Sequence, residues 1–351
     1  MLCCPADHGA LYLTTRHLHP DGHVLSGTLH CEQCGHTYEI QRGVPNLLPD
    51  SDVQVEQESL ESLQAATIDR FGFEWRHYRD WGWLEDYPDV PDAQERYFGG
   101  LLQNSEGAFW SKSLFQRDEL EPQHLVLDAG RGNGRFTYQA SLTGATVIGV
   151  DLGWGVDSAF ENSRALPNVH IVRGDLFRLP LRTAIFDRIF SIGVLMHTGN
   201  ARAAFDSIVR TLAPEGLVVA HVYGVGLPSY EAADGSIRAV TTRLPRTLQM
   251  GFSKIMSAVA RALRKGEGRR QRLYRRLYPH LNLLPTDIHM FDWWAAPIAT
   301  HHTPAELQQW FAAHGLEVLR TNPPFGDANA ETKRRRIHAA VTCLGRRPAE
   351  G

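Results

Sequence analysis

Residues 126–135, with the sequence VLDAGRGNGR, constrain this chain more than any other segment. An apolar run leads into closely spaced glycines, and a second apolar run, residues 145–150, ends at the acidic Asp151. Strands buried on both faces of a parallel sheet are apolar throughout, and glycine permits a tight turn between such a strand and a helix. The segment therefore predicts strand, glycine-rich turn, helix and strand, the first unit of a nucleotide-binding α/β sheet.

The spacing of the glycines distinguishes two kinds of cofactor. Dinucleotide binding needs G-x-G-x-x-G, but Arg135 stands at the third glycine position of that pattern. The glycines fall instead at Gly130, Gly132 and Gly134, shortly after Asp128. A carboxylate at this position repels a pyrophosphate and attracts the cationic amino group of S-adenosylmethionine. The D-x-G-x-G-x-G spacing therefore predicts a site for S-adenosylmethionine.

Residues after the next two strands complete the predicted cofactor site. Asp151 is placed to accept hydrogen bonds from both ribose hydroxyls, each worth about 1.5–3 kcal/mol. After a short strand at residues 168–172, Asp175 is placed to accept from the exocyclic amine of adenine, and Leu176 to pack on the ring. The predicted cofactor neighbours on this side are Asp151, Leu152, Asp175, Leu176 and Ser191.

The alternation of strands and helices continues along the chain. Residues 186–200 predict a fourth strand and the loop after it, and an amphipathic helix and a Pro-Glu-Gly turn follow. Residues 217–223 predict a fifth strand. Residues 316–320 and 337–344 are expected to be the sixth and seventh. Before the sixth strand, Thr303-Pro304-Ala305-Glu306 predicts a helix start with a capping box.

With these motifs in order, residues 124–223 resemble a class I S-adenosylmethionine-dependent methyltransferase of the bacterial type 11 family. The resemblance implies an α/β fold with a Rossmann-like seven-stranded sheet, whose last strand is antiparallel, and a helical insertion after the fifth strand. The domains expected are a zinc-ribbon-like module at 1–50, a helical and aromatic lid and linker at 51–120, the methyltransferase domain at 121–223 and 300–348, and a helical substrate-binding insertion at 224–299.

Four of the five cysteines lie near the amino terminus, at Cys3, Cys4, Cys31 and Cys34. Clustered thiols are metal ligands more often than disulfides in a reducing compartment. The segment resembles the zinc ribbon of tRNA-methyltransferase activators, and residues 38–49 match the way that module ends. The resemblance implies one structural zinc.

The first half of the predicted zinc site departs from the ribbon pattern, because Asp7 replaces the second cysteine of C-P-x-C. Zinc accepts carboxylate and imidazole ligands, so Asp7 or His8 can complete the site, and we assign His8, with Cys3 in reserve. The alternative is a ribbon that binds no metal and is stabilised by its hydrophobic residues. The assigned ligands are Cys4, His8, Cys31 and Cys34.

A segment rich in aromatic residues, residues 71–83, follows a polar helix start at residues 51–62. Its rings can form a small core that joins the ribbon to the sheet. They can also form a lid in which rings contact a sulfonium by cation–π attraction and exclude water. We expect both roles, with Phe71 and Trp75 as the cofactor neighbours.

His197, in the loop after the fourth strand, is the predicted catalytic base. In this fold the loop faces the donor methyl group, and a hydroxyl acceptor needs a group that takes its proton. The alternative is a histidine that only shapes the loop through hydrogen bonds to the backbone. Other candidates kept in reserve are His221, Tyr223, Asp292, His301 and His302.

The insertion is basic in its middle, where Glu267 is the single acid among eleven lysines and arginines between residues 243 and 276. Apolar residues recur there at helical spacing, which predicts an amphipathic basic helix. Three interpretations stay open: a solvated helix packed on the domain, a binding site for a phosphate-bearing acceptor or RNA, and a contact with a membrane surface for a lipid-linked acceptor.

Two further features depart from the family pattern. Residues 322–325 spell NPPF, which methyltransferases acting on base amino groups carry after the fourth strand, but here it follows the sixth, so we discount it. Arg131 stands where the family has a small residue or cysteine. It either faces solvent or marks an anion near the cofactor.

The predicted function is S-adenosylmethionine-dependent methylation of a small-molecule or glycan acceptor, most simply at oxygen. The net charge of −3 gives the chain no overall signature of polyanion binding, and no apolar run is long enough to span a bilayer, so a cytoplasmic location is expected. The alternatives are a ribosomal RNA guanine methyltransferase that binds RNA through the ribbon and the basic insertion, and an inactive scaffold or activator.

Overall fold

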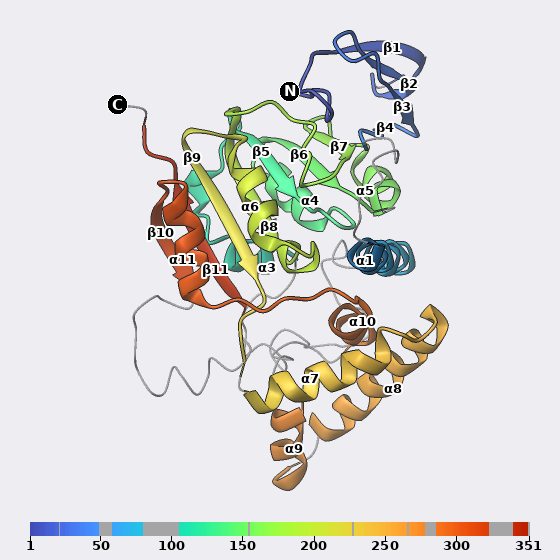
Figure 1. Cartoon of the computed structure of the whole chain (residues 1–351), viewed down its shortest axis with the longest axis vertical. Helices are drawn as coiled ribbons and strands as arrows, with labels where there is room; N and C mark the ends of the chain where they lie inside the picture. Colours follow the sequence, from blue (N-terminus) through green and yellow to red (C-terminus); the bar gives the residue numbers. More distant parts are fainter. Residues whose placement is uncertain are drawn as a thin grey trace.

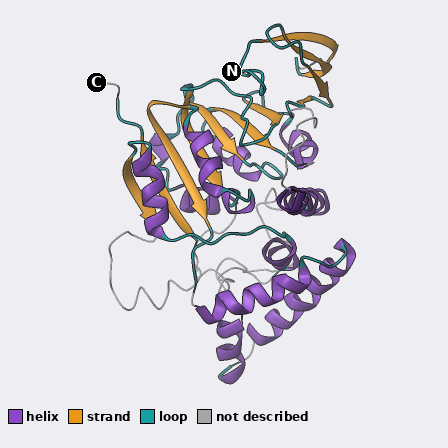
Figure 2. Ribbon diagram, viewed as in Figure 1, coloured by secondary structure: helices purple, strands orange, loops and turns teal. Residues whose placement is uncertain are grey.

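The computed structural model of the chain describes residues 1–20, 22–48, 58–79, 105–153, 155–226, 228–264, 267–277, 286–322 and 340–349. It has three parts, which Figure 1 shows in sequence colours and Figure 2 by secondary structure. A small sheet lies at one end, a large sheet with helices on both faces lies in the middle, and a group of helices lies at the other end.

The large sheet has seven strands in the order β10-β11-β9-β8-β5-β6-β7. Its strands are β5 (Leu125–Ala129), β6 (Thr146–Asp151), β7 (Val169–Arg173), β8 (Phe186–Ile192), β9 (Leu212–Val222), β10 (Glu317–Asn322) and β11 (Val341–Arg346). β11 pairs antiparallel with both β9 and β10, while the five strands from β5 to β9 pair in parallel. The predicted seven-stranded sheet with an antiparallel last strand is therefore confirmed.

The strand order reverses between β5 and β8, since the chain builds outward to β7 and then returns to β8 on the other side. Open α/β sheets bind ligands beyond the carboxyl ends of the strands at such a reversal. The topology therefore places a ligand site directly above the glycine turn that follows β5.

Two strand boundaries differ from the prediction. β9 begins at Leu212, so residues 214–216, predicted as a turn, belong to the strand. Its pairing with β8 is irregular between Phe186 and Arg188, which accommodates the Pro-Glu-Gly segment. β10 extends to Asn322, whereas most of the NPPF segment and the first residues predicted for the seventh strand lie outside the described residues.

Helices cover both faces of the sheet because its strands are apolar on both sides. On one face lie α3 (Ser105–Ser113), α4 (Arg135–Ser141) and α5 (Gly155–Ser163), and on the other α6 (Ala201–Val209) and α11 (Pro304–Ala313). Phe109 of α3 and Phe136 of α4 pack on Val126, and Phe205 of α6 packs in the cluster that contains the next strand residue, Leu127. The predicted capping box at the start of α11 is confirmed, with Thr303 as N-cap.

The amino-terminal module is a four-stranded antiparallel sheet. Its strands are β1 (Leu11–Leu18), β2 (Val24–Cys31), β3 (Thr37–Gln41) and β4 (Val44–Pro45). Leu29 and Ile40 belong to the same buried cluster as the large sheet, and the backbone N–H of Leu47 donates to the carbonyl of Arg173 in β7 (2.8 Å). The module is thus packed against the β7 edge of the large sheet.

Five helices lie beyond the carboxyl ends of the strands (Figure 1). They are α1 (Glu58–His77), α7 (Pro228–Thr241), α8 (Arg246–Arg264), α9 (Arg269–Leu277) and α10 (Asp287–Ala295). Asp234 of α7 accepts hydrogen bonds from the indole N–H groups of Trp293 (2.8 Å) and Trp294 (3.0 Å), which joins α7 to α10. The chain after β9 therefore forms a cap over the end of the sheet where the glycine turn lies.

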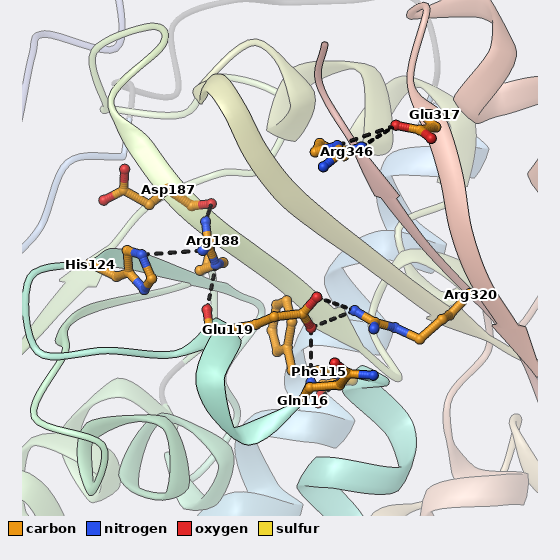
Figure 3. Close-up of polar contacts among 10 residues, drawn as sticks. Phe115, Gln116, Glu119, His124, Asp187, Arg188, Glu317, Arg320 and Arg346 are labelled. Carbon is orange, nitrogen blue, oxygen red and sulfur yellow. Dashed lines mark hydrogen bonds and ion pairs between the residues drawn. The ribbon is translucent and has the colours of Figure 1, made fainter. Parts of the chain in front are cut away.

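Polar contacts hold the segment before β5 against the central strand β8 and the edge strand β10 (Figure 3). Both carboxylate oxygens of Glu119, in the short helix η1 (Arg117–Glu119), accept from Arg320 of the edge strand β10. Arg188 of β8 donates to the backbone carbonyl of Glu119 (2.5 Å) and contacts the ring of His124 (3.2 Å). These contacts lie toward the amino ends of β5 and β8, away from the glycine turn.

Candidate active site

A cavity lies at the carboxyl ends of the central strands, where the glycine turn, helix α1 and helix α10 meet. The turn after β5 forms one wall, α1 contributes Phe71 and Trp75, and α10 contributes Asp292. The loops after β6, β7 and β8 complete it with the predicted residues Asp151, Leu152, Asp175, Leu176 and His197. Most of the residues predicted from separate motifs thus line one cavity.

The glycine turn has a backbone that only glycine adopts without strain. Gly130, Gly132 and Gly134 have φ values of 89°, 57° and 87°. A Cβ atom on Gly130 would lie 2.2 Å from Val194, and one on Gly132 would lie 2.8 Å from the indole of Trp75. The turn is therefore in close contact both with the loop after β8 and with the aromatic helix.

Two of the predicted acids have carboxylates that backbone hydrogen bonds hold in place. Asp151 accepts from the N–H of Gly132 (2.9 Å) and from that of Gly153 (2.8 Å). Asp175 accepts from the N–H of Phe177 (2.9 Å), and its burial raises the pKa of its carboxyl group. Both carboxylates are thus oriented before any ligand arrives.

Three predicted cofactor neighbours, Asp128, Gly134 and Ser191, are not among the described residues that line the cavity. Asp128 is 2% exposed and accepts a hydrogen bond from the hydroxyl of Thr137 (2.6 Å). Its burial raises the pKa of the carboxyl group to about 7. Ser191 donates to the carbonyl of Ala129 (2.8 Å). Asp128 and Ser191 are therefore bonded to the residues around the turn, and their contact with a ligand stays a prediction.

Arg131 does not face solvent. It is 4% exposed and lines the cavity. Its side chain crosses β6 at Gly149, where a Cβ atom on the glycine would lie 2.3 Å from the Cδ of Arg131. None of its guanidinium nitrogens has a hydrogen-bond partner among the described residues. Burial lowers the pKa of the guanidinium to about 10, against the opposing effect of Asp151 and Asp128. A positive charge thus lies close to the two acids of the site.

His197 lies in the short helix η2 (Leu195–His197) after β8, with its ring buried between Phe71 and Tyr223 (centroid distances 4.8 and 5.3 Å). Its Nδ1 donates to the carbonyl of Ile298 (2.6 Å), so Nε2 carries the lone pair. Nε2 has no partner within the described part of the chain. Burial lowers the pKa of the ring to about 3, so the ring is neutral and acts as a hydrogen-bond acceptor.

Asp292 of α10 supplies a second acceptor to the cavity. It accepts a hydrogen bond from the hydroxyl of Tyr223 (3.1 Å), and burial raises the pKa of its carboxyl group. Glu74 of α1 is 1% exposed, and its carboxyl pKa is raised by burial and then by the charge of Asp292. From sequence, Asp292 is only a reserve candidate and Glu74 is not predicted. A signal for Glu74 exists, since it lies three residues after Phe71, on the same side of α1.

The amino-terminal module brings together four groups that can ligate a metal ion. The sulfur atoms of Cys4, Cys31 and Cys34 and a carboxylate oxygen of Asp7 all lie within 4.8 Å of one another. Three thiolates and one carboxylate form a donor set that zinc accepts in tetrahedral geometry. His8, the predicted fourth ligand, is not part of this group, because its Nδ1 lies beside the sulfur of Cys3 (3.5 Å). Asp7 takes the fourth position instead.

Two family matches cover separate parts of the chain. Residues 127–220 match the methyltransferase domain, and residues 1–43 match the Trm112p-like proteins. The first match spans the glycine turn, Asp151, Asp175 and His197, and the second contains the four groups of the proposed metal site. The chain therefore combines a methyltransferase domain with a Trm112p-like module at its amino terminus.

Curated relatives match part of the chain. A tRNA U34 carboxymethyltransferase of Ruthia magnifica is 31% identical over 27% of this chain and 31% of its own length. A demethylmenaquinone methyltransferase of Corynebacterium kroppenstedtii is 31% identical over 33% of this chain and 49% of its own. The chain thus spans half or less of these relatives. A solved S-adenosylmethionine-dependent methyltransferase of Mesorhizobium loti covers 71% of this chain and 100% of its own at 18% identity, with a TM-score of 0.41.

Proposed function

We propose that this chain, a class I S-adenosylmethionine-dependent methyltransferase with a Trm112p-like module, methylates a hydroxyl group of a small-molecule or glycan acceptor. One observation carries the proposal: a single cavity contains both halves of the required chemistry. Oriented carboxylates and the glycine turn lie on one side of it, and the hydrogen-bond acceptors His197 and Asp292 lie on the other.

The residues around the turn fit the proposed cofactor. Asp151 would accept from the ribose hydroxyls, and Asp175 with Leu176 would hold the adenine. Leu152 and the rings of Phe71 and Trp75 would close over the ligand, while Asp128, Gly134 and Ser191 maintain the turn. S-adenosylmethionine bound there supplies an electrophilic methyl group on a sulfonium.

On the acceptor side, the protein aligns a nucleophile and receives its proton. The lone pair of His197 Nε2 accepts a hydrogen bond from the acceptor hydroxyl and orients its oxygen. A ring with a pKa of about 3 does not retain a proton at neutral pH, whereas burial raises the pKa of Asp292. The proton therefore ends on Asp292, which Tyr223 holds in place.

Several features support a small-molecule or glycan acceptor. The acceptor side is enclosed by α1 and α10, which contribute Phe71, Trp75 and Asp292 to its wall. The basic helices α8 and α9 would suit an acceptor that is phosphate-bearing or lipid-linked. On the ribbon, Arg16 is neutralised by Glu39 (2.9 Å).

RNA is the second acceptor class. The observation in its favour is that the similar protein of Ruthia magnifica is named a tRNA U34 carboxymethyltransferase. An RNA enzyme would lose affinity steeply as salt rises, because phosphate contacts release counterions. The binding of a tRNA transcript by the purified chain, measured at several salt concentrations, distinguishes the two classes.

The direct test is calorimetric titration of the full chain with S-adenosylmethionine and S-adenosylhomocysteine. We expect binding of both, and we expect Asp151→Asn to weaken it by about ten- to hundredfold, since about 1.5–3 kcal/mol is lost with a charge-assisted hydrogen bond. Asp157→Asn is the matched control, because Asp157 is ion-paired with Arg42 (3.5 Å) outside the cavity. Absence of heat with both ligands would refute the proposal.

The acceptor itself is sought by mass spectrometry of metabolites from cells with and without the gene. A compound that gains one methyl group only when the gene is present identifies it. The purified chain must then methylate that compound, and Asp292→Asn must not.

A further inference from the structure

Helix α8 carries two sets of apolar residues, one buried and one exposed. Its inner face carries Phe252, Met256 and Ala260, which pack in one cluster with Met290 and Trp294 of α10. That face accounts for the position of α8 beneath the cavity-lining helix α10 (Figure 1). A helix that only covers α10 would be polar on its other side.

In α8 a second apolar stripe, centred about 80° around the helix from this inner face, is exposed. Leu248 is 58% exposed, Ile255 is 64% exposed and Val259 is 42% exposed. Their spacings of seven and four residues place the three side chains on one stripe along the helix, within about 40° of one another. Single exposed apolar residues are ordinary on protein surfaces, but a stripe of three on one helix face is not.

Basic residues lie on the exposed side of α8 as well, about 100–160° around the helix from this stripe. Lys254 and Arg261, seven residues apart and both exposed, form an edge on the same outer side of α8. The start of α9 adds exposed Arg269, Arg270 and Arg272, with Leu273 44% exposed beside them. We call the exposed apolar stripe of α8 and these exposed residues of α8 and α9 together the outer face. Between residues 239 and 286 the sequence contains a single acid, Glu267.

We propose that the outer face docks this protein onto a bilayer that contains anionic phospholipid. Cationic side chains would meet the lipid phosphates, and the stripe of Leu248, Ile255 and Val259 would enter the boundary between headgroups and acyl chains. A nucleic acid would satisfy the basic residues but would leave the apolar stripe in water. Within the described residues no helix is long and apolar enough to cross a bilayer, so the contact is peripheral.

Docking would orient the proposed active site. α8 lies directly against α10, and Asp292 of α10 lines the cavity, so one helix layer separates the outer face from the acceptor groups. An acceptor with a lipid anchor would then be presented to the cavity at the membrane surface. This last step rests on the proposed function, whereas the docking itself does not.

The test is co-sedimentation of the full chain with two kinds of vesicle, pure phosphatidylcholine and phosphatidylcholine with about 30% phosphatidylglycerol. We expect the chain to bind the anionic vesicles at least tenfold more tightly than the neutral ones. Equal partitioning into both, or into neither, would overturn the proposal.

Two variants divide the outer face into its components, and each is expected to lower binding to anionic vesicles at least tenfold. The first is Ile255→Ser with Val259→Ser, and the second is Lys254→Glu with Arg261→Glu. Leu142→Ser is the control, because Leu142 is 59% exposed at the end of α4, away from α8, and should leave binding unchanged.

Circular dichroism and calorimetry with S-adenosylhomocysteine check that each variant is folded and keeps its cofactor site. If charge reversal abolishes binding while the serine variant binds as the wild type does, the face is a polyanion site and the proposal is wrong. If the wild type binds vesicles without binding S-adenosylhomocysteine, the proposed function fails and the docking stands.

Discussion

The contact between Gly132 and Trp75 gives a prediction that separates backbone strain from packing. Gly132 has φ 57°, and a Cβ there would lie 2.8 Å from the indole of Trp75. Alanine at this φ costs about 1–2 kcal/mol in any surroundings. Forcing the indole aside adds about 1–3 kcal/mol of overpacking. Gly132→Ala should therefore lower the free energy of unfolding by about 2–5 kcal/mol.

A matched glycine isolates the packing contribution. Gly315, after α11, has φ 64°, and nothing lies within 4 Å of a Cβ placed on it. Gly315→Ala should lose only the backbone part, about 1–2 kcal/mol. The assay is urea unfolding of the wild type and both variants, and then of Gly132→Ala combined with Trp75→Ala.

The double variant should recover the packing part, so the two substitutions should couple by about 1–3 kcal/mol. The reasoning is refuted if Gly132→Ala costs no more than Gly315→Ala, or if Trp75→Ala leaves the cost of Gly132→Ala unchanged. Since Trp75 also lines the cavity, Gly132→Ala should weaken S-adenosylhomocysteine binding in the same series.

Three further predictions follow from other parts of the molecule. Asp292→Asn should abolish methyl transfer to the identified acceptor while S-adenosylhomocysteine binding, measured by calorimetry, stays within about twofold; a parallel loss of binding would contradict its place on the acceptor side. Asp7→Ala should lower the zinc content found by elemental analysis and the thermal midpoint, whereas His8→Ala should leave both unchanged; the reverse result would restore His8 as the ligand. Burial raises the pKa of the Asp128 carboxyl group to about 7, above its ordinary value of 3.8. The folded state therefore binds this proton more tightly than the unfolded chain does. Ionisation of Asp128 consequently lowers the free energy of unfolding as pH rises from about 4 to 7. The stability of Asp128→Asn relative to the wild type, from urea unfolding, should therefore increase over that range, and a flat difference would show that Asp128 is not shifted.

Local patterns were sufficient for the sheet and for one half of the site. Apolar runs that end in glycine or aspartate predicted β5, β6 and β7, because a strand buried on both faces has no room for polar side chains. The same adjacency pointed to Asp151 and Asp175, which lie at or just after the carboxyl ends of β6 and β7 and line the cavity. His197 was found in the same way, after β8.

Prediction from sequence was weaker where a position depends on side-chain direction within a turn. Asp128, Gly134 and Ser191 belong to the right motifs but support the turn without lining the cavity. Arg131 could not be oriented from sequence, and the small Gly149 on β6 is what makes room for it. In the ribbon, neighbouring Asp7 and His8 are equal candidates by composition, and the backbone conformation decides between them.

The amino-acid sequence by itself determined the order of strands and helices, the glycine turn and the carboxylates at the ends of strands, because these depend on contacts between residues near one another in the chain. Only the tertiary structure decided which distant groups meet. It brings Glu74, Tyr223 and Asp292 together with His197 from elements that no local pattern connects. Burial among them then sets their pKa values, and burial is a property of the folded chain as a whole.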